Sequence, residues 1–480
     1  MLFNRAATLV ALLAAAAAAF LHLRASAPVD NIYRGVATVA CGERDCALDA
    51  LAEPSLLRWH NDAARRAAIE VAWRVPDIER SLSGSNLSFS TKWCLPASCS
   101  DGALFLNVNA DIAAEANVSV RLHDRTILPF GEFWASASAR DGTWRYAGLT
   151  LDRERDVELT RAADVAAPRA TLSGRSRRAW AARLWFSSAG VEAQLHYDEL
   201  HNAFVQLVGR KEIVLLPPNA STWLRLYPRP HPLQRQSRFR VPLHRSARAP
   251  AVPVCTCASE EGYALVVADA ERGCGADALG WIDTAPEAAA AFSRAARRVV
   301  LHPGDTLYIP PYWYHAVLAL DASLSLSLTA SAEEAPVVHA VRAQRHCTDA
   351  WWPQAKKALA LRLHLVSLLG RPRLADLFAQ RYAFSGAAPS AAAGAGGDAA
   401  WAQSCDDAAR GDAAPLLTPA ERARAIAVAR TRRALFDTIR NGAAREQIEM
   451  NEAEMMIAQE LGHGTVAAFL RRCVLDGDGA

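Results

Sequence analysis

His196, Asp198 and His315 are the residues of this sequence whose types and spacing best suit metal chemistry. One residue separates His196 from Asp198, and side chains two positions apart in a strand point to the same side of it. With His315 from a distant strand, two imidazoles and one carboxylate can occupy one face of a metal ion. This set suits non-haem Fe(II), because the opposite face stays open for a co-substrate and dioxygen. Because His-x-Asp tripeptides are common by chance, the metal-site prediction depends on the sequence that flanks these residues.

Strand-like segments surround these candidate ligands. Residues 203–208 and 211–216 are apolar runs on either side of a turn that contains Gly209, which predicts a β-hairpin. Residues 306–309 form a short apolar run after a Pro-Gly-Asp turn. Serine alternates with leucine over residues 323–328, the pattern of a half-buried strand. We therefore expect the metal ligands to project from β-structure, where side-chain directions are well fixed.

Two longer motifs contain these segments. The stretch HYDELHNAFVQLVGRKEIVLLPP, together with HPGDTLYIPPYWYHAV, resembles the JmjC or cupin-like family of Fe(II)- and 2-oxoglutarate-dependent oxygenases. Within that family the pattern is most similar to the asparaginyl hydroxylase of hypoxia-inducible factor, over about residues 140–330. The resemblance implies an α+β fold whose core is a double-stranded β-helix (cupin, or jelly-roll), with an N-terminal α/β region and C-terminal helices.

The resemblance also implies roles for individual residues. His196, Asp198 and His315 would bind Fe(II), and 2-oxoglutarate would be the co-substrate. Lys211 and Tyr146 would bind the distal carboxylate of 2-oxoglutarate, and Asn202 would lie near its iron-bound end. Arg235 and Gln236 would hold the target side chain. The implied reaction converts 2-oxoglutarate to succinate while a protein side chain is hydroxylated.

Two positions depart from the pattern of the resembled enzyme. Ala193 stands where that enzyme has a threonine, and Ser327 is the expected occupant of an asparagine position. Both changes remove polar groups from the co-substrate pocket. They leave open a catalytically inactive scaffolding protein as the alternative to a hydroxylase. A metal-binding cupin with another activity is a third reading, against which Lys211 and Asn202 argue.

Other histidines lack such support. A buried histidine is more often a hydrogen-bonded core residue than a metal ligand. We therefore expect His201, His231 and His302 to be structural or exposed. Arg235 and Gln236 could equally belong to a plain surface loop.

The N-terminus has the layout of a secretory signal, with a short basic start and an alanine-rich apolar run. Residues 1–27 are expected to be a cleaved signal peptide or, less favoured, an uncleaved signal anchor. Glycosylation sequons at Asn86, Asn117 and Asn219 agree with that route. The expected location is the lumen of the endoplasmic reticulum or Golgi, or outside the cell; an anchor would make a single-pass type II membrane protein. The net charge of +3 is too small to argue for nucleic acid.

Cysteine usage points the same way. The chain has ten cysteines, and two closely spaced pairs suit small disulfide loops: Cys41 with Cys46, and Cys94 with Cys99. Three others form no complete zinc pattern and are expected to be disulfides or free thiols: Cys255, Cys257 and Cys274.

The chain is expected to hold one catalytic domain with flanking regions. We assign residues 28–125 to an N-terminal region, 126–340 to the catalytic domain and 341–480 to a helical region with a flexible linker at 385–415. In the resembled enzyme the C-terminal helices form dimer contacts, which implies a homodimer; equally, they could cover one face of the barrel.

Several segments have helical periodicity or helix-start signals. Helices are predicted over 62–73, 287–298, 352–382 and 448–470, and a capping box begins a further helix at Thr418.

Overall fold

The computed structural model describes residues 34–41, 46–48, 51–59, 61–83, 86–93, 103–115, 124–137, 143–166, 170–171, 180–241, 243, 280–282, 285–383, 401, 403–405 and 416–476. The predicted signal segment, Asn117 and the cysteines at 94, 99, 255, 257 and 274 lie outside these residues. Most of the predicted linker also lies outside them; the part that is described, 401 and 403–405, is helical.

Two facing sheets form a double-stranded β-helix, which confirms the predicted fold class. One sheet contains the order β16-β13-β18-β11 and the other the order β17-β12-β19-β10. The chain passes repeatedly from one sheet to the other, as a jelly roll requires. The core strands are β10 (Ala181–Ser187), β11 (Val191–Tyr197), β12 (Leu200–Val208), β13 (Lys211–Leu216), β16 (Arg297–Leu301), β17 (Thr306–Ile309), β18 (Tyr314–Ala319) and β19 (Ser323–Ser331).

The predicted hairpin over residues 203–216 is wrong, although both of its strands exist. β12 pairs with β17 and β19, whereas β13 pairs with β16 and β18 in the other sheet. The turn between them carries the chain across the barrel. Gly209 has φ +70°, and a Cβ there would lie 2.3 Å from the carbonyl oxygen of Ala322, so only glycine fits this crossing.

The alternating strand β19 is buried on both faces, not half-buried as predicted. Leu324 and Leu326 pack in the core outside the barrel, while Ser323, Ser325 and Ser327 are also buried. The serines occupy the barrel interior, where small polar side chains leave space and can accept hydrogen bonds. The period-2 pattern is confirmed, but the second face of the strand is buried in the barrel and is not exposed to solvent.

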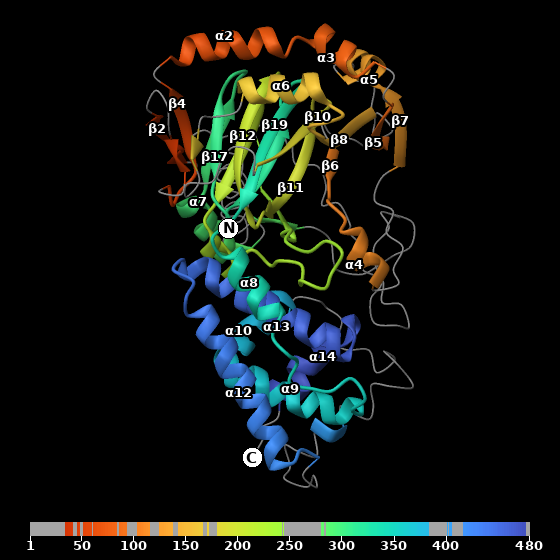
Figure 1. Ribbon diagram of the computed structural model, residues 1–480, viewed down its shortest axis with the longest axis vertical. Helices are drawn as coiled ribbons and strands as arrows, with labels where there is room; N and C mark the ends of the chain where they lie inside the picture. The colour runs from red at the N-terminus through yellow and green to blue at the C-terminus, as the bar shows by residue number, and fades with distance from the viewer. Residues whose placement is uncertain are drawn as a thin grey trace, which may run out of the picture.

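The outer face of the larger sheet is covered by N-terminal helices, which surround the top of the barrel in Figure 1. These are α2 (Asp62–Ala72), α3 (Val75–Ser81), α5 (Phe130–Ala137) and α6 (Val157–Ala166). α2 confirms the helix predicted over 62–73. The same sheet is extended by β8 (Thr143–Thr150), β5 (Asn86–Trp93) and β7 (Asp124–Pro129) on one side, and by β4 (Ser55–Trp59) and β2 (Ala37–Cys41) on the other.

The smaller sheet is covered by the C-terminal helices, which form the lower half of the molecule (Figure 1). Leu195, Tyr197 and Tyr314 from this sheet share a buried cluster with Leu365 and Ile457 from the helices. The sheet is extended by β1 (Arg34–Gly35) and β6 (Ala103–Phe105), and the short helix α4 (Ala110–Glu115) follows β6. The helices are α8 (Ala335–Arg342), α9 (Gln354–Leu369), α10 (Arg371–Arg381), α12 (Pro419–Phe436), α13 (Gly442–Leu461) and α14 (Val466–Phe469).

Several helix boundaries differ from the predicted ones because a single residue interrupts the pattern. The helix predicted over 352–382 is divided by Gly370 (φ +80°), and that over 448–470 by Gly462 (φ +106°). The helix predicted over 287–298 is α7 (Pro286–Ala295), after which the chain enters β16. The capping box is confirmed: Thr418 accepts from the Glu421 backbone and Glu421 accepts from the Thr418 backbone.

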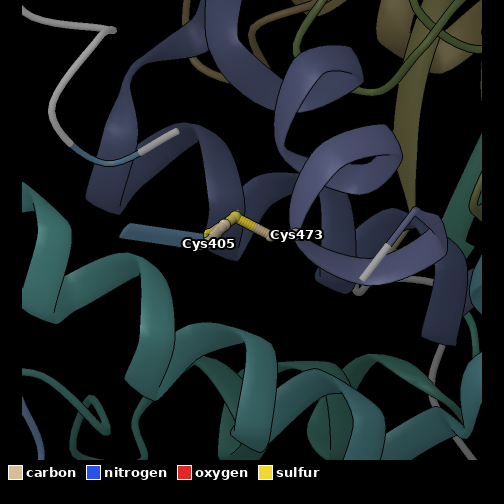
Figure 2. The surroundings of a disulfide bond; sticks show 2 residues. All are labelled: Cys405 and Cys473. Atoms are coloured by element: carbon tan, nitrogen blue, oxygen red, sulfur yellow. A yellow bond between two sulfur atoms is a disulfide. The ribbon is translucent and has the colours of Figure 1, made fainter. Parts of the chain in front are cut away.

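A disulfide joins Cys405 to Cys473 within the helical region, with a Cα–Cα distance of 5.0 Å (Figure 2). Cys405 ends the short helical stretch at 403–405, and Cys473 lies in the last described turn of the chain. Local spacing does not predict this pair, because 68 positions separate the two residues. Cys41 is disulfide-bonded, and Cys347 is a buried free thiol.

Among the helices of the described residues, none combines the length and apolar character needed to cross a bilayer.

Candidate metal centre

Pairing between β11 and β18 brings the two candidate histidines together. His196 and His315 are directly opposite each other across this antiparallel ladder, and their ring centroids are 4.2 Å apart. Their neighbours Tyr197 and Tyr314 point to the outer face and pack against the C-terminal helices. Strict alternation therefore sends both imidazoles into the barrel.

Asp198 completes the set immediately after β11. Each of His196, Asp198 and His315 offers a ligand atom within 4.8 Å of the others. Nε2 of His315 lies 3.8 Å from a carboxylate oxygen of Asp198. The backbone oxygen of Asp198 accepts a 2.7 Å hydrogen bond from the amide of Tyr312, which has φ 65°. The segments that carry the second and third ligands are thus held together through their backbones.

Backbone carbonyls orient both rings. Nδ1 of His196 lies 2.6 Å from the oxygen of Gln194, and Nδ1 of His315 lies 3.2 Å from the oxygen of Trp313. A carbonyl can only accept, so each Nδ1 carries the proton and donates it. Nε2 of each ring then has a free lone pair that can bind a metal. In metal-binding histidines the other ring nitrogen usually donates a hydrogen bond of this kind.

The electrostatics favour the protonation states that a metal needs. Burial, reinforced by the charge of His196, lowers the pKa of His315 to about 4. Burial opposes ionisation of Asp198, but the charges of His196 and His315 outweigh it and lower the pKa of that carboxyl. Near neutral pH the site therefore presents a neutral imidazole at His315 and a carboxylate at Asp198, as a divalent cation requires.

Lys211 lies in the same barrel, at the start of β13. Its side chain is buried and its Nζ lies 5.6 Å from the centre of the Phe204 ring. Among the described residues no carboxylate lies within ion-pair distance of it, and burial lowers the pKa of its ammonium to about 7. A buried ammonium without an acid is costly, so this position suits an anionic ligand.

Asn202 offers a second unsatisfied group. It is on β12, on the same side of the strand as Phe204, and its Oδ1 is buried without a hydrogen-bond partner among the described residues. Lys211 and Asn202 thus place an unpaired cation and an amide in one barrel, the residue types that the resemblance implied for a co-substrate pocket.

Tyr146 reaches the barrel from β8. Its ring stacks on Trp185 with a centroid distance of 5.4 Å and packs against the cluster that contains Ala319. Ala319 is directly opposite Lys211 in the β13–β18 ladder. The phenol and the ammonium are therefore placed on the same part of the barrel wall. Burial raises the pKa of Tyr146, so its hydroxyl stays a hydrogen-bond donor.

Trp185 and Arg183 are site residues that the sequence analysis missed. Nε1 of Trp185 donates a 3.1 Å hydrogen bond to the hydroxyl of Ser327, and the Arg183 guanidinium lies 4.4 Å from the Trp185 ring. The Arg183 charge also lowers the pKa of Asp198. Alternation along β10 could have identified both, since Leu184 and Phe186 are its outward-facing apolar positions.

The two expected substrate residues, Arg235 and Gln236, lie near the metal ligands, but they differ in how far contacts within the protein already use their side chains. Nη1 of Arg235 is 3.7 Å from an oxygen of Asp198, and the residue has φ 65°. The Gln236 amide is used within the protein: it donates to the oxygen of Asn107 at 2.6 Å and accepts from the amide of Asn107 at 2.9 Å. Arg235 remains a candidate for substrate contact, whereas Gln236 holds two segments together.

The remaining histidines match expectation. Nδ1 of the buried His201 lies 2.7 Å from the hydroxyl of Tyr308. His231 is buried and accepts from the backbone amide of Leu233 at 3.0 Å, while the side chain of His302 is mostly exposed.

A chain of buried polar contacts joins the metal-binding strand to the C-terminal helices. The Tyr197 hydroxyl accepts from Nδ2 of Asn451 at 3.0 Å, and Oδ1 of Asn451 accepts from Arg381 at 3.0 Å. Arg381 forms a fully buried ion pair with Glu454, and Glu454 accepts from the backbone amide of Arg229 at 2.9 Å. Arg229 returns to the metal-binding segment, because its guanidinium lies 3.2 Å from Glu199. Residues 196 and 198 thus face the metal site, while 197 and 199 are fixed by the helical region.

Comparison with known proteins agrees with this geometry. Residues 103–341 match the family described as Cupin-like domain. "Jumonji C domain-containing protein 5" of Drosophila melanogaster is 30% identical over 145 residues, which are 30% of this chain and 26% of that protein. The aligned part therefore spans about a quarter of the relative's length.

Proposed function

We propose that the protein, whose residues 103–341 match the cupin-like family, is an Fe(II)- and 2-oxoglutarate-dependent protein hydroxylase. One observation carries the proposal: two histidines and an aspartate converge in a barrel that also buries the unpaired Lys211. The donor set is the facial triad of non-haem Fe(II) oxygenases. The ammonium of Lys211 would pair with a carboxylate of a dicarboxylate co-substrate.

The proposed reaction balances without a further reductant. 2-Oxoglutarate, dioxygen and a substrate C–H group give succinate, carbon dioxide and a C–OH group. One oxygen atom enters succinate and the other enters the product alcohol. Bound Fe(II) would supply the activation of dioxygen.

The chain's own residues position the reactants. His196, Asp198 and His315 would hold the metal, with both histidines oriented by backbone carbonyls. Lys211 and Tyr146 would bind the distal carboxylate, and Asn202 would bond near the opposite end of the co-substrate. Arg235, 3.7 Å from Asp198, would contact the substrate side chain at the mouth of the site.

We assign the substrate to proteins of the secretory pathway. The basic and apolar start of the chain supports that compartment. The Cys405–Cys473 disulfide adds support, since disulfides persist in oxidising lumens. Asn219, in the third sequon, is exposed and so accessible to glycosylation.

The second candidate is a scaffolding protein that retains the barrel without turnover. Two observations favour it: Ala193 offers no polar group, and the Ser327 hydroxyl is already bonded to Trp185. Under this reading the C-terminal helices would carry the contacts to partners. A cupin of another activity is the third reading, and it leaves Lys211 without a role.

Succinate release separates the first candidate from the others. The full chain, loaded with Fe(II), would be incubated with 2-oxoglutarate and a luminal protein extract, with His196→Ala as the matched control. We expect succinate formation that the extract stimulates and that His196→Ala abolishes. Equal release by the parent and the variant would reject the hydroxylase.

A further inference from the structure

A polar cavity lies between the helical region and the segment 229–234, and none of the three metal ligands lines it. Its volume is about 250 Å³, and α4, α8, α12, α13 and the segment 229–234 contribute to its wall. Part of the wall is apolar and is formed by Ile112, Val341, Met455 and Met456. A cavity of this size can hold a small organic molecule or several waters.

Four basic side chains line the wall, and they differ in whether a carboxylate pairs with them. Three of them have acidic partners: Arg342 with Glu452 at 2.5 Å, His346 with Glu460 at 2.8 Å, and Arg229 with Glu199 at 3.2 Å. Arg432 is the exception, since no carboxylate of the described residues lies within ion-pair distance of it.

Arg432 is nevertheless buried, with 3% of its surface exposed. Its Nη1 lies 2.9 Å from Nε2 of His364 and 2.7 Å from the sulfur of Met456, and its Nη2 lies 3.5 Å from the oxygen of Gln344. Its Nε has no hydrogen-bond partner among the described residues. These direct neighbours are neutral. The carboxylates of Glu452, which also lines the cavity, and Glu460 act on the Arg432 charge from beyond ion-pair distance, and they are paired with Arg342 and His346. Arg432 thus has no directly paired acid beside an open space, and a buried charge without such a partner is costly.

Gln234 adds an unused acceptor to the same wall. It is 7% exposed, and its Oε1 is buried without a hydrogen-bond donor among the described residues. A ligand with a hydroxyl group would satisfy that oxygen, while its carbon chain would contact the apolar part of the wall.

We propose that this cavity binds a small aliphatic hydroxycarboxylate, whose carboxylate pairs with the guanidinium of Arg432. A planar guanidinium accommodates a carboxylate through paired hydrogen bonds. The hydroxyl group bonds to Gln234. None of the three metal ligands lines this cavity, so binding there can be tested without metal or turnover.

Methionine methyl groups provide a local probe of the cavity. The chain has four methionines, of which Met455 and Met456 line the cavity and Met450 lies elsewhere in α13. The full chain, labelled with ¹³C at the methionine methyls and kept metal-free with a chelator, would be titrated with 3-hydroxybutyrate. The uncharged 3-hydroxybutyramide is the matched ligand control.

We expect saturable shifts at Met455 and Met456, little change at Met450, and no saturation with the amide. Arg432→Gln should weaken binding about tenfold or more, because a hydrogen-bonded charge pair is lost. Arg430→Gln, an exposed position of the same helix, should bind like the parent. Unchanged binding in Arg432→Gln, or equal binding of the amide, would overturn the proposal.

A second variant covers the case in which Arg432→Gln fails to fold. Val341→Phe would fill the cavity without removing a charge. Loss of the saturable shifts in this variant supports the cavity as the site, and shifts equal to those of the parent would overturn it.

Discussion

The hydroxyl of Tyr197 accepts a 3.0 Å hydrogen bond from Asn451, so the segment that carries two candidate metal ligands, His196 and Asp198, is bonded to a helix of the C-terminal region. Tyr197 lies between His196 and Asp198, and it cannot move without moving both. Asn451 is held in turn by Arg381, which is paired with Glu454. The C-terminal helices therefore form part of the support of the metal site.

The first prediction concerns this support. Glu454→Gln should destabilise the fold by about 3–5 kcal/mol, because it leaves the charge of Arg381 buried without a partner. The exposed pair of Arg210 and Asp321 is the control, and Arg210→Gln should cost no more than about 1 kcal/mol. Denaturant unfolding of the two variants measures both. Similar losses in the two would show that the buried pair has no special role.

The second prediction concerns metal affinity. Tyr197→Phe removes only the hydroxyl that Asn451 contacts, and groups that support metal ligands change affinity by about 10–100-fold when removed. We expect weaker Fe(II) binding by about tenfold with little change in fold, measured by anaerobic titration. Tyr308→Phe is the control, since its hydroxyl contacts His201 and not a ligand. Parent-like affinity in Tyr197→Phe would contradict the supporting role.

The third prediction follows from the burial of Lys211. Its pKa is lowered to about 7 by burial, so the unfolded chain holds this proton more tightly than the folded chain does. The unfolded state therefore binds more protons between about pH 7 and 10, and stability without ligand should rise with pH across that window. Lys211→Met should remove this rise and should be more stable than the parent at pH 6. A pH profile of unfolding identical in both proteins would contradict the assignment.

The fourth prediction concerns binding of 2-oxoglutarate. Because only the charged ammonium pairs with a carboxylate, affinity should fall by up to about tenfold per pH unit above pH 7. Lys211→Arg keeps its charge and should lose this pH dependence. Affinities would be measured by calorimetry at several pH values. The same decline in Lys211→Arg would place the titrating group elsewhere.

The fifth prediction concerns the disulfide. Cys405→Ser should lower the free energy of unfolding by about 2–5 kcal/mol, since the Cys405–Cys473 bond closes a long loop of the unfolded chain. Cys347→Ser, at the free buried thiol, is the control for the loss of a sulfur atom from the core. If a reducing agent left the parent as stable as before, the disulfide would not contribute.

Local signals in the sequence were enough to predict strands β12, β13, β17 and β19, the capping box at Thr418 and the convergence of His196, Asp198 and His315. They were not enough for pairing: the partners of β12 and β13 depend on contacts across the barrel that no local turn signal encodes. Gly370 and Gly462 ended helices whose apolar periodicity continues past them.

The site was predictable where a motif carried it and not where tertiary contacts did. Trp185 and Arg183 belong to no motif: alternation along β10 places them on the barrel side, but only the fold brings them to Ser327 and Asp198. Gln236 matched a motif position, but its amide is taken by Asn107, a contact between residues 129 positions apart.

The most direct test is an anaerobic titration of the full chain with Fe(II) and 2-oxoglutarate, followed by the visible metal-to-ligand charge-transfer absorption. We predict a band that requires both additions and disappears in His196→Ala and His315→Ala. Lys211→Met should still bind Fe(II) but should need a much higher concentration of 2-oxoglutarate. A folded protein that binds Fe(II) without forming the band, or that binds neither, would contradict the proposed oxygenase.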